Sequence, residues 1–209
     1  MVTRKRILVH QIKEWGEILV GFESRNRYEL KDESGALIGY AAEEGGGFGR
    51  AVGRQLFGSG RKATIHVLDA QGKEVARGDK PFTWFFHRVE VFADGRKLGA
   101  IHRRFTLLHR RFTVETADGR ELFTVDSPFL QIWTFKLLFK GQEVGVIKKK
   151  WGGMLKEMFS DADVFGLEYD DLPELEAVRP LLIFATLLVD FVCFENNRGS
   201  GGMFVGGGE

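Results

Sequence analysis

An acidic stretch in the last third of the chain contains residue types that bind hard cations. Asp161, Asp163 and Phe165 occupy positions 1, 3 and 5 of a twelve-residue frame like that of EF-hand calcium loops. Position 12 is Leu172, where such a loop has a bidentate glutamate. The candidate ligands are Asp161, Asp163, Phe165, Glu168, Asp170 and Asp171. The pattern predicts a weak Ca²⁺ site, with a dissociation constant of about 10⁻⁴–10⁻³ M; the alternative is a solvated polar turn capped by Asp161.

Three basic clusters are candidates for binding anions. Their members are Arg103, Arg104, Arg110, Arg111, Lys148, Lys149 and Lys150. If neighbouring hairpins bring the clusters together, the patch would bind anionic lipid headgroups, because each cation near an anionic bilayer contributes about 1 kcal/mol. The alternative is an ordinary solvated strand face that discourages aggregation. The same charges could bind nucleic acid, but no nucleic-acid-binding motif accompanies them, so nucleic acid is not expected as a partner.

An aromatic segment is the third candidate. Phe82, Trp84, Phe85 and Phe86 follow Pro81 without alternation, so both faces of the segment are apolar. Exposed, these side chains would contact a membrane interface; the alternative is a strand buried on both faces.

Signals for catalysis are weak. The five histidines lack metal-ligand spacing, and no serine-hydrolase elbow is present. Cys193 lies within an apolar segment, which favours inert packing over a nucleophilic role. The sequence therefore predicts a protein that is not an enzyme.

The elements that must position these residues are mainly hairpins. Five alternating segments are interrupted by polar turns whose glycines are Gly35, Gly72, Gly95, Gly119 and Gly141. Alternation across such a turn predicts a β-hairpin, since glycine accepts the positive φ that the turn requires. Five hairpins give ten strands, and the segment 18–22 is a candidate for one more. So many antiparallel strands must close into a barrel or split into a sandwich.

The segment Leu181–Phe194 breaks this pattern, because it is apolar except for Thr186 and Asp190. A helix without a polar face must be enclosed by protein or by lipid. The clean run is shorter than the ~20 residues that a bilayer requires, so a buried core helix is favoured over a membrane span. Asp190 should then be paired or protonated.

Composition limits the remaining classes. The 209 residues carry a formal charge of +1, which gives no global attraction to polyanions. The apolar run after the basic N-terminus is too short for a signal peptide, and one cysteine allows no intrachain disulfide. We therefore expect a cytoplasmic location, with peripheral attachment to membranes through local charge.

Taken in order, several segments resemble the phospholipid scramblase family. The most specific is Trp151-Gly-Gly-Met-Leu-Lys-Glu-Met-Phe-Ser-Asp-Ala-Asp-Val-Phe-Gly166, which is similar to the family signature. Asn26-Arg-Tyr-Glu-Leu-Lys31 and Asp69-Ala-Gln-Gly-Lys-Glu-Val75 resemble its first half. The resemblance extends from about Ile7 to Glu195. The family's cysteine cluster is missing, because Pro81-Phe-Thr-Trp-Phe-Phe86 stands in its place.

This resemblance implies an all-β fold of the tubby-like (LURP-one-related) type, a closed antiparallel barrel of about twelve strands around a hydrophobic C-terminal helix. We expect a basic segment at 1–6, a barrel domain at 7–197 with its helix near 176–195, and a disordered glycine-rich tail at 198–209. The implied activity is Ca²⁺-dependent, energy-independent movement or binding of membrane phospholipids. The alternative is a soluble module that binds phosphoinositides, other anionic headgroups or a protein partner without transport.

Overall fold

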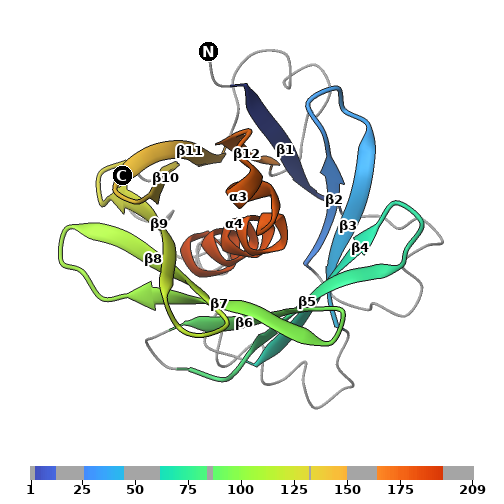
Figure 1. Ribbon diagram of the computed structural model, residues 1–209, viewed down its shortest axis with the longest axis horizontal. Helices are drawn as coiled ribbons and strands as arrows, with labels where there is room; N and C mark the ends of the chain where they lie inside the picture. The colour runs from blue at the N-terminus through green and yellow to red at the C-terminus, as the bar shows by residue number, and fades with distance from the viewer. Residues whose placement is uncertain are drawn as a thin grey trace, which may run out of the picture.

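Among the described residues, twelve antiparallel strands form a closed barrel around the helices α3 and α4 (Figure 1). The computed structural model describes residues 3–12, 26–44, 62–83, 87–131, 133–149 and 164–194. The strands are β1 (Arg4–Gln11), β2 (Arg27–Lys31), β3 (Leu37–Glu43), β4 (Ala63–Asp69), β5 (Glu74–Lys80), β6 (Arg88–Ala93), β7 (Arg96–Arg104), β8 (His109–Thr116), β9 (Glu121–Pro128), β10 (Thr134–Phe139), β11 (Gln142–Lys149) and β12 (Val164–Asp170). The helices are α3 (Pro173–Glu176) and α4 (Arg179–Cys193).

The five predicted hairpins are confirmed. The glycine of each turn has a positive φ, between 72° at Gly95 and 84° at Gly35 and Gly119, which is the backbone conformation that favours glycine. The hairpins are β2–β3, β4–β5, β6–β7, β8–β9 and β10–β11, and each pairs with the next. Local turn chemistry therefore sets most of the sheet.

The barrel is closed by pairing between β1 and β12, the first and last of the described strands in the sequence. Arg4 lies opposite Asp170, and Ile7 lies opposite Leu167. β1 also pairs with β2, and β12 with β11. Closure leaves no sheet edge among the described strands. Of the two predicted alternatives, a barrel or a sandwich, the fold is therefore the barrel.

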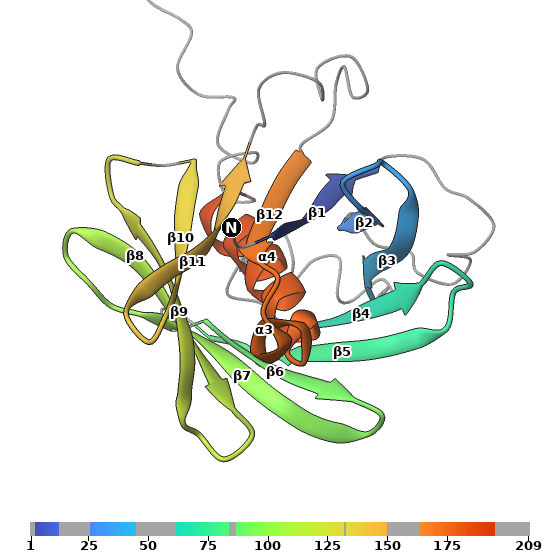
Figure 2. The ribbon, with the colours of Figure 1, turned by 45° about the horizontal axis from the view of Figure 1, so that its top comes forward.

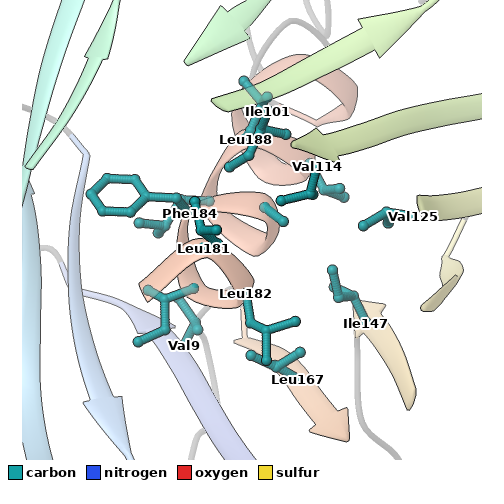
Figure 3. Packing of buried hydrophobic residues seen from close by; sticks show 14 of the residues in the cluster. Val9, Ile101, Val114, Val125, Ile147, Leu167, Leu181, Leu182, Phe184 and Leu188 are labelled. Carbon is teal, nitrogen blue, oxygen red and sulfur yellow. The ribbon is translucent and has the colours of Figure 1, made fainter. Parts of the chain in front are cut away.

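The apolar helix α4 passes through the barrel interior (Figures 1 and 2). Every residue from Leu181 to Val192 is buried. Leu181, Leu182 and Leu188 pack among strand residues that include Val9, Ile101, Val114, Val125, Ile147 and Leu167 (Figure 3). Each such leucine contributes about 1.5–3 kcal/mol when fully removed from water. The predicted core helix is confirmed, and among the described helices none has the length and hydropathy needed to cross a bilayer.

The buried carboxylate of α4 has a partner on the barrel wall. The Tyr28 hydroxyl on β2 donates a hydrogen bond of 2.6 Å to Asp190 Oδ2. Asp190 is 2% exposed, so this bond offsets part of the cost of its burial. The expected pairing of Asp190 is confirmed, with Tyr28 as a partner.

Two boundaries differ from the sequence prediction. β1 begins at Arg4, inside the segment expected to precede the barrel, because residues 4–6 pair with the end of β12, with Arg4 opposite Asp170 and Arg6 opposite Glu168. The second half of the acidic frame is a strand and not a loop, since Phe165, Leu167 and Tyr169 alternate inward in β12. The expected extra strand at 18–22 and the tail at 198–209 lie outside the described residues.

Candidate functional site

The two ends of the barrel have different connections. In an antiparallel barrel, every connection from an odd to an even strand lies at the same end. Here these connections are residues 12–26, 44–62, 81–87, 105–108, 129–133 and 150–163. We call this the long-loop end. The opposite end has the short glycine turns of the five hairpins.

The predicted basic clusters lie at the long-loop end. Arg103 and Arg104 end β7, Arg110 and Arg111 are near the start of β8, and Lys148 and Lys149 end β11. Arg104 and Arg111 are directly opposite each other in the β7–β8 ladder. The structure thus brings the four arginines together on the neighbouring strands β7 and β8, while Lys150 lies outside the described residues.

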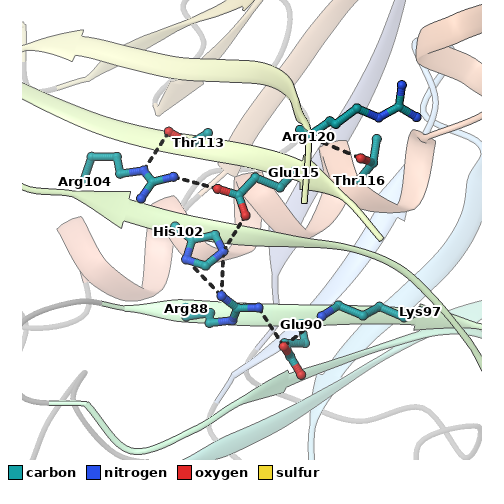
Figure 4. A network of polar contacts seen from close by, with 9 residues as sticks. All are labelled: Arg88, Glu90, Lys97, His102, Arg104, Thr113, Glu115, Thr116 and Arg120. Carbon is teal, nitrogen blue, oxygen red and sulfur yellow. Dashed lines mark hydrogen bonds and ion pairs between the residues drawn. The ribbon is translucent and has the colours of Figure 1, made fainter. Parts of the chain in front are cut away.

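Strand alternation divides these arginines between two faces. Arg104 lies on the outer face, where it donates hydrogen bonds to Thr113 Oγ1 at 3.1 Å and to Glu115 Oε1 at 2.6 Å (Figure 4). Arg111 donates to Asp126 Oδ1 at 2.8 Å, and His109 Nδ1 lies 2.8 Å from Asp126 Oδ2. The outer arginines are therefore partly neutralised by carboxylates of β8 and β9.

Figure 4 shows that this outer network continues to the next strand. His102 Nε2 lies 3.0 Å from Glu115 Oε2 and 2.9 Å from Arg88 Nη1. Burial lowers the pKa of His102, and the charge of Arg88 lowers it further. The outer face of β6–β8 is consequently a mixed network of both charge signs and not a purely cationic patch.

The other two arginines are on the inner face of the wall. Arg103 is opposite Phe112, and Arg110 is opposite Ser127, and both of these partners are fully buried. The charges of Arg103 and Arg110 act on Cys193 in the last turn of α4. Burial nevertheless raises the pKa of the Cys193 thiol to about 11, which agrees with its predicted inert role.

Two buried lysines join them around the same helix end. Lys80 is 1% exposed, with Nζ 5.3 Å from the centre of the Phe191 ring. Lys149 is 8% exposed, with Nζ 4.3 Å from the Phe194 ring centre. α4 has no basic residue in its last turn. We call Lys80 and Lys149 the internal cations; with Arg103 and Arg110 nearby, they supply the positive charge that a helix C-terminus favours.

Several apolar side chains are exposed at the long-loop end, and of these only Phe82 was a candidate from the sequence. Among the described residues, the exposed large hydrophobic side chains are Phe82, Phe105, Leu107, Leu108, Phe129, Leu130 and Trp133 at this end and Val75 elsewhere. The exposed fractions of Leu107 and Leu130 are 84% and 94%. The detectable signal was a connection rich in Phe and Leu, where turn residues such as Gly, Asn or Asp are usual.

The predicted aromatic segment is described in part. Phe82 is 44% exposed and lies in the β5–β6 connection, at the long-loop end. Trp84, Phe85 and Phe86 lie outside the described residues.

The described acidic candidates, Glu168, Asp170 and Asp171, lie in the second half of β12 or directly after it. Asp161 and Asp163 lie outside the described residues, and the described chain resumes at Val164. Glu168 accepts hydrogen bonds of 3.1 Å from Arg4 and from Arg6, and Asp170 accepts one of 3.1 Å from Arg4. Lys5 Nζ lies 3.0 Å from Asp171. These three carboxylates are therefore already neutralised by β1.

Their electrostatics agree with this pairing. Burial alone would raise the pKa of Glu168, but the hydrogen bonds from Arg4 and Arg6 outweigh burial and hold it below its usual value. Phe165 is buried and opposite Val9 and Lys149 in the sheet. Within the described ranges, no group of three or more His, Cys, Asp or Glu side chains is arranged to hold a metal ion. The predicted Ca²⁺ site therefore stays a prediction, and it depends on Asp161 and Asp163, since Glu168, Asp170 and Asp171 are paired with β1.

Fold and site together define a class: a closed β-barrel that encloses an apolar helix and gathers cations and exposed apolar loops at one end. The chain belongs to the scramblase family, whose model, described as Scramblase, matches residues 1–196.

Similar proteins include bovine phospholipid scramblase 2, which is 28% identical over 93% of this chain and 70% of its own length. Human phospholipid scramblase 1 is 28% identical over 91% of this chain and 63% of its own length. The chain thus spans under two thirds of the human relative. A solved structure of an Arabidopsis thaliana protein covers 88% of this chain at 13% identity, with a TM-score of 0.47.

Proposed function

We propose that this protein binds membrane phospholipids through its long-loop end and moves them between leaflets without an energy source. Membership of the scramblase family carries this proposal, because the matched model extends over both the barrel and α4. The arginines at this end support it, since guanidinium groups bind phosphate in a bidentate manner.

The enclosed helix restricts how lipid could move. α4 is buried on all sides by the barrel, so the folded protein would act from the membrane surface, by distorting the bilayer locally. A headgroup-binding module without transport is the second candidate. It is favoured by the same observation, because a filled barrel offers no passage through its centre.

Calcium dependence belongs to the proposal through Asp161 and Asp163, which are spaced for ligation in the sequence. Bound Ca²⁺ would supply positive charge for contact with phosphate oxygens. Glu168, Asp170 and Asp171 would remain paired with β1.

Reconstitution into liposomes with a fluorescent lipid in both leaflets tests the proposal. With millimolar Ca²⁺, the wild-type protein should make the inner-leaflet label accessible to a membrane-impermeant quencher. The double variant Asp161→Ala/Asp163→Ala should lose most of this Ca²⁺-stimulated movement. The control is Asp118→Ala, an exposed carboxylate in a short turn at the opposite end. Vesicle binding with no label movement by the wild type would reject transport and leave the binding module.

A further inference from the structure

We propose that the β7–β8 and β9–β10 loops form an apolar tip that inserts into the interface of an anionic bilayer. The tip consists of Phe105, Leu107, Leu108, Phe129 and Leu130. This inference rests on the proposed function only in its choice of a lipid partner, and it specifies which surface of the protein contacts that partner.

Exposure provides the first argument. The exposed fractions of Phe105, Leu107 and Leu108 are 80%, 84% and 71%, and those of Phe129 and Leu130 are 59% and 94%. Proteins rarely expose contiguous apolar patches of more than a few hundred Å² without an interaction that covers them. At the opposite end, each described hairpin turn contains glycine and is polar. The exposed apolar residues are therefore concentrated at one end.

Contiguity provides the second argument. The Phe129 amide donates a backbone hydrogen bond of 2.9 Å to the Leu108 carbonyl, so the two loops are joined edge to edge. Ser127 Oγ donates to the Gln131 carbonyl at 2.7 Å, which holds the second loop in a compact turn. The tip is thus one surface supported by the β8–β9 pairing, and ordering it on a membrane would cost little entropy.

Charge complementarity identifies the occupant. Arg104, Arg110 and Arg111 flank the tip, and we call them the basic collar. Arg104 and Arg111 also pair with Glu115 and Asp126, so Arg110 contributes most to the positive charge of the collar. The Arg110 guanidinium lies 5.0 Å from the Phe129 ring centre, which links collar and tip. Within the described part of the chain, no carboxylate forms an ion pair with Arg110. An apolar tip under a basic collar matches a bilayer with an anionic surface, whereas a second copy of this end would place cation against cation.

Vesicle co-sedimentation tests the inference, with phosphatidylcholine vesicles and with mixed phosphatidylcholine–phosphatidylserine vesicles. The double variant Leu107→Ser/Leu130→Ser should bind the mixed vesicles at least tenfold more weakly than the wild-type protein does. The matched control is Val75→Ser, an exposed apolar residue on β5 close to the opposite end. Arg110→Ala should weaken binding to the mixed vesicles severalfold, and the exposed Arg120→Ala should not.

Insertion is measured directly with an environment-sensitive dye. In a Cys193→Ser background, dye on Leu107→Cys should shift to the blue with mixed vesicles, and dye on Val75→Cys should not. Unchanged binding by the leucine variant, or no shift at position 107, would overturn the inference. So would a wild-type protein that binds neither kind of vesicle, and the tip would then be left for a protein partner.

The outcomes separate this inference from the proposed function. If wild type binds through the tip but moves no lipid, transport fails and the inference stands. If wild type moves lipid and the leucine variant binds and moves it equally well, the inference fails and transport stands.

Discussion

At the scale of residues, charge inside the barrel is organised around the end of α4. Lys80 contacts the ring of Phe191 and Lys149 the ring of Phe194, close to a helix terminus that has negative polarity. Tyr28 holds Asp190 in the same part of the barrel. The cluster sequence Lys148-Lys149-Lys150 therefore includes one residue, Lys149, that packs against the helix instead of facing solvent.

His87 should make stability depend on pH. It is 4% exposed, and burial together with the charges of Lys80 and Arg103 lowers its pKa from 6.5 to about 4. As pH falls from 6.5 toward 4, the unfolded chain binds a proton at His87 and the folded protein does not, so the free energy of unfolding decreases. Because solvent screens part of these interactions, we expect His87 to account for about 1–2 kcal/mol of that loss.

Urea unfolding at pH 7.5 and pH 5 measures this effect. The free energy of unfolding should decrease less between the two pH values in His87→Gln than in the wild type. Part of the decrease should remain in the variant, because it retains His10 and His102, whose pKa values are also lowered. The same decrease in both proteins would show that His87 titrates normally in the fold.

At the scale of elements, three hairpins share a pair of glycines, one in the turn and one in the strand after it. The turn glycines Gly35, Gly95 and Gly141 are each followed four residues later by another glycine. In β7 that second glycine is Gly99, where a Cβ would lie 2.1 Å from the backbone oxygen of Glu115 on β8. A ladder irregularity between Val91 and Phe92 lies directly opposite this part of β7. The close approach of two backbones explains why a side chain is missing there.

Gly99→Ala should therefore destabilise the protein by about 1–3 kcal/mol, since the clash is with backbone and cannot be relieved by a rotamer change. Arg96→Ala, at an exposed position of the same strand, serves as the control. The measurement is the midpoint of urea unfolding with the denaturant slope held in common. A Gly99→Ala protein as stable as the control would mean that the β7–β8 spacing adapts without cost.

The hairpins could be predicted from the sequence, whereas the pairing that closes the barrel could not. The hairpins were predictable because each depends on a few adjacent residues and a glycine with positive φ. The pairing of β1 with β12 had no local signal, because Arg4 and Asp170 are 166 residues apart. Without that pairing, Glu168 and Asp170 looked available for Ca²⁺, although Arg4 and Arg6 neutralise them.

The basic residues were predictable as clusters in the sequence, but their arrangement in space was not. Adjacent arginines in a strand face opposite sides, so Arg103 and Arg104 cannot belong to one flat patch. Their assignment to the inner and outer faces required the register with Phe112 and Arg111. The apolar tip was missed because Phe105-Thr-Leu-Leu108 looks like a continuation of a strand.

At the scale of the whole molecule, the barrel has a polar end with short turns, and the described cations and exposed apolar side chains gather at the opposite, long-loop end. Docking by the long-loop end would place the C-terminus of α4 toward the membrane, because Cys193 lies near Arg103 and Arg110. The open mechanistic choice is then whether α4 stays in the barrel when the protein binds a bilayer.

We expect α4 to stay, because extraction would expose twelve buried residues, Leu181–Val192, and leave Asp190 without Tyr28. The alkylation rate of Cys193, in the last turn of α4, measures whether the helix stays in the barrel. Its thiol pKa, raised from 9.0 to about 11, lowers the thiolate fraction at pH 7.5 about a hundredfold. Alkylation should accordingly be about a hundredfold slower in the folded protein than in urea, and equally slow on phosphatidylserine-containing vesicles. Leu107→Cys in the Cys193→Ser background is the exposed control, with rapid alkylation in solution. A Cys193 that reacts tenfold faster on vesicles than in solution would mean that the helix leaves the barrel at the membrane.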